Sequence, residues 1–168
     1  MLLDRVPVTS DAGAISRVVS MAQDPTTDTL YVIVQRGVRR LATIEPTTGV
    51  ATQLGSLGDS FASLAFDATG QLWGVTGSSG LAPRTLYRID KTDGTRTLGR
   101  ALNLGSGACI AHHPTENALY HWANGLAKID ITAPGLDITP IPTTGLLPNE
   151  PTSCVFDPSP VSDSTSTV

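Results

Sequence analysis

The stretch "DPTTDTLY", residues Asp24–Tyr31, returns in altered form as "DATGQLW" at Asp67–Trp73 and as "HPTENALY" at His113–Tyr120. Its first two letters occur once more at Asp157. Successive copies begin 43, 46 and 44 residues apart. Internal repeats of this length with strand-like content are typical of the blades of β-propellers. The repeated stretch therefore predicts the fold class.

Each copy stands between two apolar segments that read as strands. In the middle unit, "SLAF" (63–66) precedes the copy, "LWGVTG" (72–77) continues it, and "RTLYRID" (84–90) and "GTRTLGR" (94–100) follow. Asp followed by Pro or Ala and then Thr suits a type I turn. No segment has a sustained apolar period of 3.6 residues, which excludes much helix. We expect an all-β fold of four-stranded antiparallel blades with a repeat of about 44 residues.

Two further turns and several core positions follow from the same pattern. "EPTTGV" (Glu45–Val50) and "DKTDGT" (Asp90–Thr95) place Gly49 and Gly94 where a hairpin requires positive φ. Equivalent apolar positions of the repeat are expected to be buried, namely Leu30, Phe66, Leu72, Leu119 and Phe156. The repeat thus predicts the backbone conformation of two glycines and the burial of five named side chains.

The 168 residues suffice for one domain. We expect a single propeller-like domain over residues 1–158, followed by a polar tail at 159–168. Its blades are expected at about 14–57, 60–101 and 106–144, with flanking strands at 2–9 and 151–156. Closed propellers have at least about four blades. Three blades form an open arc, so we expect a partial propeller that a second copy or a partner chain completes.

The chain resembles a known group of repeats. "SLAFDATGQLWGVTG" (Ser63–Gly77) and "LYRIDKTDGT" (Leu86–Thr95) are similar to the NHL-type and quinoprotein-dehydrogenase-like β-propeller repeats of bacterial secreted and surface proteins. The resemblance implies blade architecture and an extracellular or cell-surface location. Quinoprotein enzymes need a full ring of blades around their cofactor, so no cofactor is expected here.

Composition excludes several classes of partner. The formal net charge is −4 and the pI about 5.2, and Lys91 and Lys128 are the only lysines. Such a chain offers no basic patch for nucleic acid. No apolar run approaches the roughly 18–20 residues of a membrane span, and the N-terminus has no signal-peptide pattern. We interpret Cys109 and Cys154 as small buried residues and not as a disulfide.

Catalytic and metal-binding motifs are missing from the sequence. It contains no G-x-S-x-G, H-E-x-x-H, Walker or Rossmann pattern, so no catalytic residue is assigned. His112, His113 and His121 lie within ten residues of one another, which suggests a metal site. However, the position of His112 holds Gln23 and Phe66 in other units, which favours packing. We therefore assign no metal ligand.

Trp122 is the first candidate binding residue. Equivalent positions of the other units hold Ile33 and Val75, so this aromatic side chain is not required by the repeat. Tyr31 and Tyr120, in contrast, occupy a repeated position that favours core packing. An exposed aromatic residue suits an interface or a carbohydrate platform.

Two loops supply the other candidates. Arg36, Arg39 and Arg40 form the densest positive cluster, in "QRGVRR", although a solvated hairpin tip would have the same composition. Ser78 and Ser79 belong to the long polar loop of the middle blade. Binding residues are frequent in loops that a rigid scaffold positions.

The sequence favours a non-enzymatic binding or scaffold module, a partial propeller completed by oligomerisation or by a partner chain. Two alternatives stay open: a fragment of a larger propeller enzyme of the hydrolase or lyase type, and a carbohydrate-binding propeller.

Overall fold

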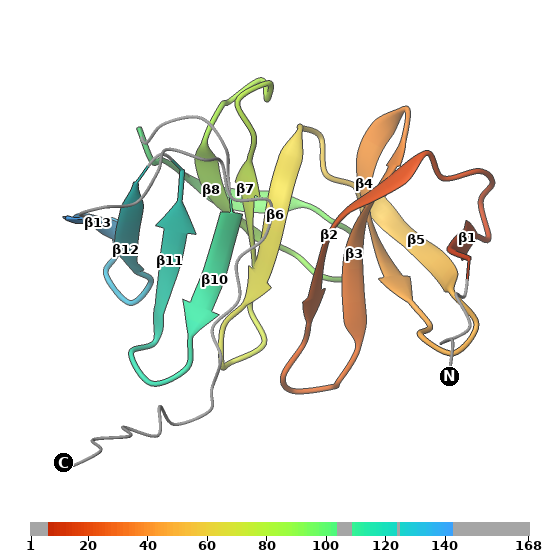
Figure 1. Cartoon of the computed structure of the whole chain (residues 1–168), viewed down its shortest axis with the longest axis horizontal. Helices are drawn as coiled ribbons and strands as arrows, with labels where there is room; N and C mark the ends of the chain where they lie inside the picture. Colours follow the sequence, from red (N-terminus) through yellow and green to blue (C-terminus); the bar gives the residue numbers. More distant parts are fainter. Residues whose placement is uncertain (1–6, 104–108, 124, 143–168) are drawn as a thin grey trace, which may run out of the picture.

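The computed structural model describes residues 7–103, 109–123 and 125–142, and Figure 1 shows their arrangement. The first sheet contains β1 (Thr9–Ser10), β2 (Arg17–Gln23), β3 (Leu30–Arg36), β4 (Val38–Ile44) and β5 (Val50–Ser56). The second contains β6 (Phe61–Phe66), β7 (Leu72–Thr76), β8 (Thr85–Ile89) and β9 (Arg96–Ala101). The third contains β10 (Cys109–His113), β11 (Ala118–Trp122), β12 (Leu126–Asp130) and β13 (Asp137–Ile141).

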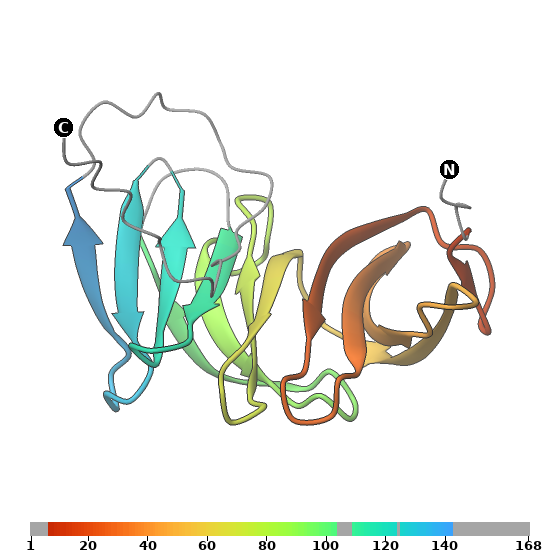
Figure 2. The same cartoon turned by 60° about the horizontal axis from the view of Figure 1, so that its bottom comes forward.

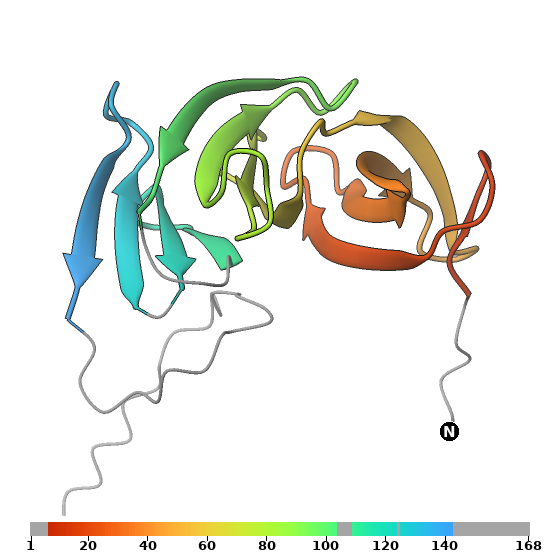
Figure 3. The ribbon, with the colours of Figure 1, turned by 90° about the horizontal axis from the view of Figure 1, so that it is seen from above.

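The three sheets are propeller blades, referred to below as blades 1, 2 and 3. Strands β2–β5, β6–β9 and β10–β13 each pair antiparallel in chain order. Seen from above in Figure 3, the blades form an open arc with β2, β6 and β10 on its inner side. The expected all-β partial propeller is confirmed. The described part of the chain contains no helix, and so none that could cross a membrane.

Blade 1 departs from the four-stranded plan. The short strand β1 adds to it in parallel, along the outer edge of β5. Residues 11–16 then cross to β2, and Ile15 packs against a small core of Val32, Val34, Ala42 and Ala51, all fully buried. The blade consequently curls over its own free face, as Figure 2 shows. Residues 1–6, 151–156 and 159–168 of the expected flanking strands and tail lie outside the described residues.

Two apolar layers hold the blades together. Between blades 1 and 2 the layer includes Ile33, Leu41, Phe61, Leu72 and Ile89. Between blades 2 and 3 it includes Trp73, Val75, Leu86, Ile110, Leu119 and Ile129. Of the positions expected to be buried, Phe66, Leu72 and Leu119 are, and Leu30 is half-buried. Phe156 lies outside the described residues.

The turns behave as expected. Gly49 and Gly94 have φ of 70° and 79°, and their N–H groups donate to the carbonyls of Glu45 and Asp90 at 2.8 and 2.9 Å. In the repeated stretch, an Asp24 carboxylate oxygen accepts the N–H of the residue two positions on, at 2.9 Å. Asp67 does the same at 2.9 Å. The repeated stretch is therefore a corner that each blade builds by the same hydrogen bond.

Cys109 corrects one expectation. It is buried on β10, and it forms a disulfide. In the sequence, Cys109 and Cys154 stand 45 residues apart, one position out of register with the repeat, and this spacing does not exclude a disulfide. Cys154 lies outside the described residues.

Candidate binding site

A pocket of about 680 Å³ opens between blades 1 and 2, and is called the inter-blade pocket below. It lies at the end of the blades where β2 begins, where β3 turns into β4, and where β5 leads into β6. Its size is within the range of small-molecule sites. Its lining residues are Ser16, Arg17, Gln35, Gly37, Val38, Arg39, Ser56, Gly58, Asp59, Ser60, Ser79 and Leu81.

A row of three polar side chains forms the blade 1 wall. Gln35 of β3 lies opposite Arg17 of β2 and also opposite Arg39 of β4. Residues directly opposite one another share a face of the sheet, at a spacing of about 5 Å. The Arg39 guanidinium donates to the backbone carbonyl of Phe61. Burial lowers the pKa of Arg39, and the positive charge of Arg17 lowers it further.

Asp59 holds the opposite wall in place. One carboxylate oxygen accepts the N–H groups of Ser60 and Leu81 at 2.6 and 2.7 Å. The other accepts the N–H of Ala82 at 3.1 Å and lies 3.2 Å from the Arg96 guanidinium. Burial would raise the pKa of Asp59, but these donors and the Arg96 charge lower it. The ionised carboxylate thus fixes the 77–84 loop beside the pocket.

Hydroxyl groups from several segments point into the same region. The Ser60 and Ser79 hydroxyls lie 3.4 Å apart and join the β5–β6 and β7–β8 loops. The Ser16 hydroxyl donates to the Gln35 carbonyl at 2.8 Å. Ser56 accepts the N–H of Gly58 at 3.2 Å. The pocket is therefore lined by hydroxyl groups as well as by guanidinium groups.

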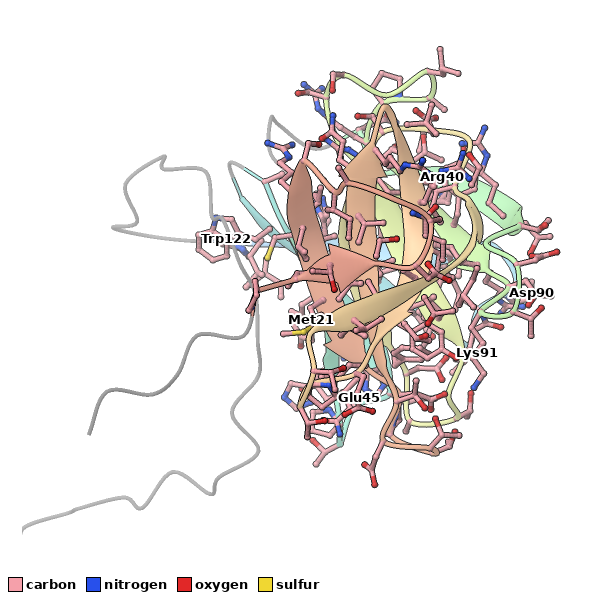
Figure 4. All side chains as sticks on the ribbon, turned by 90° about the vertical axis from the view of Figure 1, so that its right-hand side faces the viewer. Met21, Arg40, Glu45, Asp90, Lys91 and Trp122 are labelled. Carbon is pink, nitrogen blue, oxygen red and sulfur yellow. The ribbon has the colours of Figure 1, made fainter. Side chains whose placement is uncertain are left out.

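The structure separates the three arginines that the sequence grouped. Arg39 lines the pocket, whereas Arg36 and Arg40 lie on the other face of blade 1, because successive strand residues alternate. The Arg36 guanidinium lies against Gly13, where an added Cβ would be 2.9 Å from it. Figure 4 shows Arg40 near one end of the blades.

The other candidates divide in a similar way. Ser79 lines the inter-blade pocket, and its neighbour Ser78 does not. Trp122 lies in blade 3, half-buried and paired with Cys109. In Figure 4 it lies with Met21 on the inner side of the arc. The sequence thus grouped residues that belong to two separate surfaces.

Sequence reasoning missed Arg17, Gln35 and Asp59. A signal for Gln35 was available, since Gly37 at the hairpin tip sets the register that aligns Gln35 with Arg39. Asp59 lies in a connection between blades, and no repeat marks it.

A second hollow of about 410 Å³ lies on the inner side of the arc and is called the inner groove below. Strands β2, β6 and β10 supply its apolar lining, including Met21, Leu64, Phe66, Ile110 and Ala111. The Met21 side chain is 60% exposed.

The histidines do not converge on a metal site within the described residues. His113 pairs with Ala118, and His112 and His121 share one face of blade 3, as the repeat suggested. The His121 ring is fully buried, and neither nitrogen has a hydrogen-bond partner among the described residues. Burial lowers its pKa to about 4. His112 lies 3.3 Å from Asn117.

Comparison with known proteins supports the architecture. No family model and no curated protein matches the sequence. Among solved structures, a structural genomics protein of unknown function from Bacteroides thetaiotaomicron VPI-5482 is similar, with a TM-score of 0.55 and 17% identity over 71% of this chain and 32% of that chain. XC5397 from Xanthomonas campestris, described as a gluconolactonase, gives a TM-score of 0.48 and 20% identity over 66% of this chain and 36% of that one.

The fold is of the propeller type. At these identities the first similarity shows the fold alone, and the second is too weak to support any inference. The chain spans about a third of the length of each of these structures. The resemblance to NHL-type repeats stays an expectation, because no family model matches.

Proposed function

We propose that the chain is a non-enzymatic binding or scaffold module, a partial propeller completed by further copies of itself or by a partner chain. One observation supports this proposal: the inner groove is apolar and open. Met21, one of its lining residues, is 60% exposed. In a closed ring the strands of this groove would line a central channel and face other blades.

The energetics of apolar surface favour completion. Each 100 Å² of apolar surface removed from water contributes roughly 2.5 kcal/mol. Stable interfaces bury on the order of 1,600 Å² in total. An open arc that continues into further blades would bury its inner strands and its terminal faces together. The curl of blade 1 already covers part of one terminal face, and the inner groove is a further apolar surface that assembly would cover.

Solution mass tests the proposal. Analytical ultracentrifugation of the 17.5 kDa chain at micromolar concentration should give a dimer or larger species. Met21→Glu should shift the distribution toward the monomer, because it places a charge in the inner groove. Leu81→Glu is the matched control, since Leu81 is 87% exposed and lies at the inter-blade pocket. Self-association that both variants leave unchanged, or a compact wild-type monomer that unfolds cooperatively, would contradict assembly through this surface.

A further inference from the structure

We propose that the inter-blade pocket binds a sugar acid, a hydroxylated carboxylate, with Arg17 and Arg39 at the carboxylate and Ser60 and Ser79 at the hydroxyl groups. The pocket is built by blades 1 and 2 of one chain. The inference therefore does not depend on completion of the ring.

The charge of the pocket selects an anion. Asp59 is the only carboxylate among the lining residues, and it already lies 3.2 Å from Arg96. Neither Arg17 nor Arg39 forms a salt bridge within the described residues, although Arg39 feels the Asp59 charge and donates to the Phe61 carbonyl. The two guanidinium groups repel each other: burial lowers the pKa of Arg39 most, the charge of Arg17 lowers it further, and the Asp59 carboxylate offsets part of this. A carboxylate placed between them would remove this repulsion and form charge-assisted hydrogen bonds.

This positive site contrasts with the chain as a whole, whose formal net charge is −4. Of the described arginines, two project from one row of blade 1 on either side of the Gln35 amide. The amide supplies both a donor and an acceptor between the two charges. Such an array suits a carboxylate that carries a neighbouring hydroxyl group.

The size and lining of the pocket select a ligand larger than a simple ion. A volume of about 680 Å³ exceeds what one carboxylate or phosphate group fills. Ser60 and Ser79 offer hydroxyls on the wall opposite the arginines. Val38 and Leu81, 53% and 87% exposed, form an apolar rim that can contact the C–H face of a sugar ring.

The blade 2 wall is preorganised. Asp59 accepts the N–H groups of Leu81 and Ala82, and the Thr76 hydroxyl donates to the Ala82 carbonyl at 2.5 Å. These bonds hold the loop that carries Ser79 before any ligand arrives. Asp59 is accordingly a positioning residue, and its carboxylate has no free capacity for the ligand. Preorganisation reduces the entropy lost on binding.

Isothermal titration calorimetry of the full chain tests the proposal. The probes are glucuronate, galacturonate and mannuronate, compared with glucose and glucose 6-phosphate at the same ionic strength. At least one uronate should bind, more tightly than both comparison sugars, and the affinity should fall as salt is raised. Failure of all three uronates at millimolar concentration would overturn the inference, and so would tighter binding of glucose 6-phosphate.

Variants assign the binding to this pocket. Arg17→Gln should weaken uronate binding about ten- to a hundredfold, the loss expected for one charge-assisted contact. Arg17 is exposed and forms no ion pair within the described residues, so folding should be preserved. Arg100→Gln, an exposed arginine on β9 outside the pocket, is the control and should bind normally. Equal affinities of the two variants would exclude the pocket. A monomeric chain that binds uronate would contradict the assembly proposal and leave this one standing.

Discussion

Gly55→Ala tests how closely blades 1 and 2 approach each other. Gly55 lies on β5, where the outer edge of blade 1 meets the β8–β9 turn of blade 2. A Cβ at this position would lie 1.6 Å from the carbonyl oxygen of Asp93 and 2.7 Å from its carbonyl carbon. Real Cβ atoms essentially never approach another atom within 3.0 Å. Backbone must therefore move by roughly 1.5 Å to admit one methyl group.

The turn resists such a movement. The N–H of Gly94 donates to the Asp90 carbonyl at 2.9 Å, and the Asp90 N–H donates to the carbonyl of Thr95 at 2.7 Å. The Asp90 carboxylate also accepts the N–H of Thr92 at 2.8 Å. Overpacking costs about 1–3 kcal/mol where side chains yield, and more where backbone must. We expect Gly55→Ala to lower the free energy of unfolding by about 2–4 kcal/mol, or the Tm by about 5–15 °C.

Urea unfolding followed by circular dichroism and tryptophan fluorescence measures this change. Gly77→Ala is the matched control, because its Cβ would lie 3.5 Å from the Ala62 Cβ and 3.6 Å from the Ser60 carbonyl, both ordinary contacts. The control should stay within about 1 kcal/mol of the original chain. If the two variants prove equally stable, the inferred close contact between Gly55 and the Asp93 carbonyl is refuted.

Two predictions concern pH. Burial lowers the pKa of His121 to about 4 from 6.5. The unfolded chain therefore takes up this proton first as pH falls, and stability should decrease by about 3 kcal/mol between pH 6.5 and 4. Urea unfolding at several pH values measures this decrease, and His121→Leu should remove it. A free energy of unfolding that depends on pH as strongly in the variant as in the original chain would refute the prediction. Burial would raise the pKa of Asp24, but hydrogen bonds, chiefly from Lys91 at 2.5 Å, lower it from 3.8 to about 2. Its contribution is complete above about pH 4 and is lost as pH falls through about 2. Acid unfolding followed by circular dichroism should therefore show a smaller loss of stability between about pH 4 and pH 2 in Asp24→Asn than in the original chain. An equal loss in both would contradict the role of the Asp24–Lys91 ion pair.

The fold was predictable because the sequence repeats its structural requirements. Asp24 and Asp67 each close the same corner by the same hydrogen bond, and Gly49 and Gly94 adopt the positive φ that their hairpins need. Each of these features depends on neighbours within about five residues. Turn and hairpin preferences of neighbouring residues were therefore enough to predict the strands and corners, and three copies of one pattern indicated that they form blades.

The candidate site was predictable only in part, because it depends on strand register and on contacts between blades. Arg36, Arg39 and Arg40 are close in sequence, yet only Arg39 lines the pocket. A shift of one residue in the hairpin around Gly37 would reverse which arginines face blade 2. Asp59 acquires its role from the 77–84 loop, whose position no local pattern specifies.

The two ends of the blades consequently serve different purposes. At the end with the repeated corners, the carboxylates are used by the fold: Asp24 accepts from Thr26 and Lys91, and Asp67 accepts from Thr69 and Trp73. Substitution there would destabilise a blade before it altered any ligand contact. At the other end, the connections differ between blades, and neither Arg17 nor Arg39 forms a salt bridge within the described residues. If the inter-blade pocket binds the proposed sugar acid, its specificity can change at that end without loss of the fold, because the repeat does not share these positions.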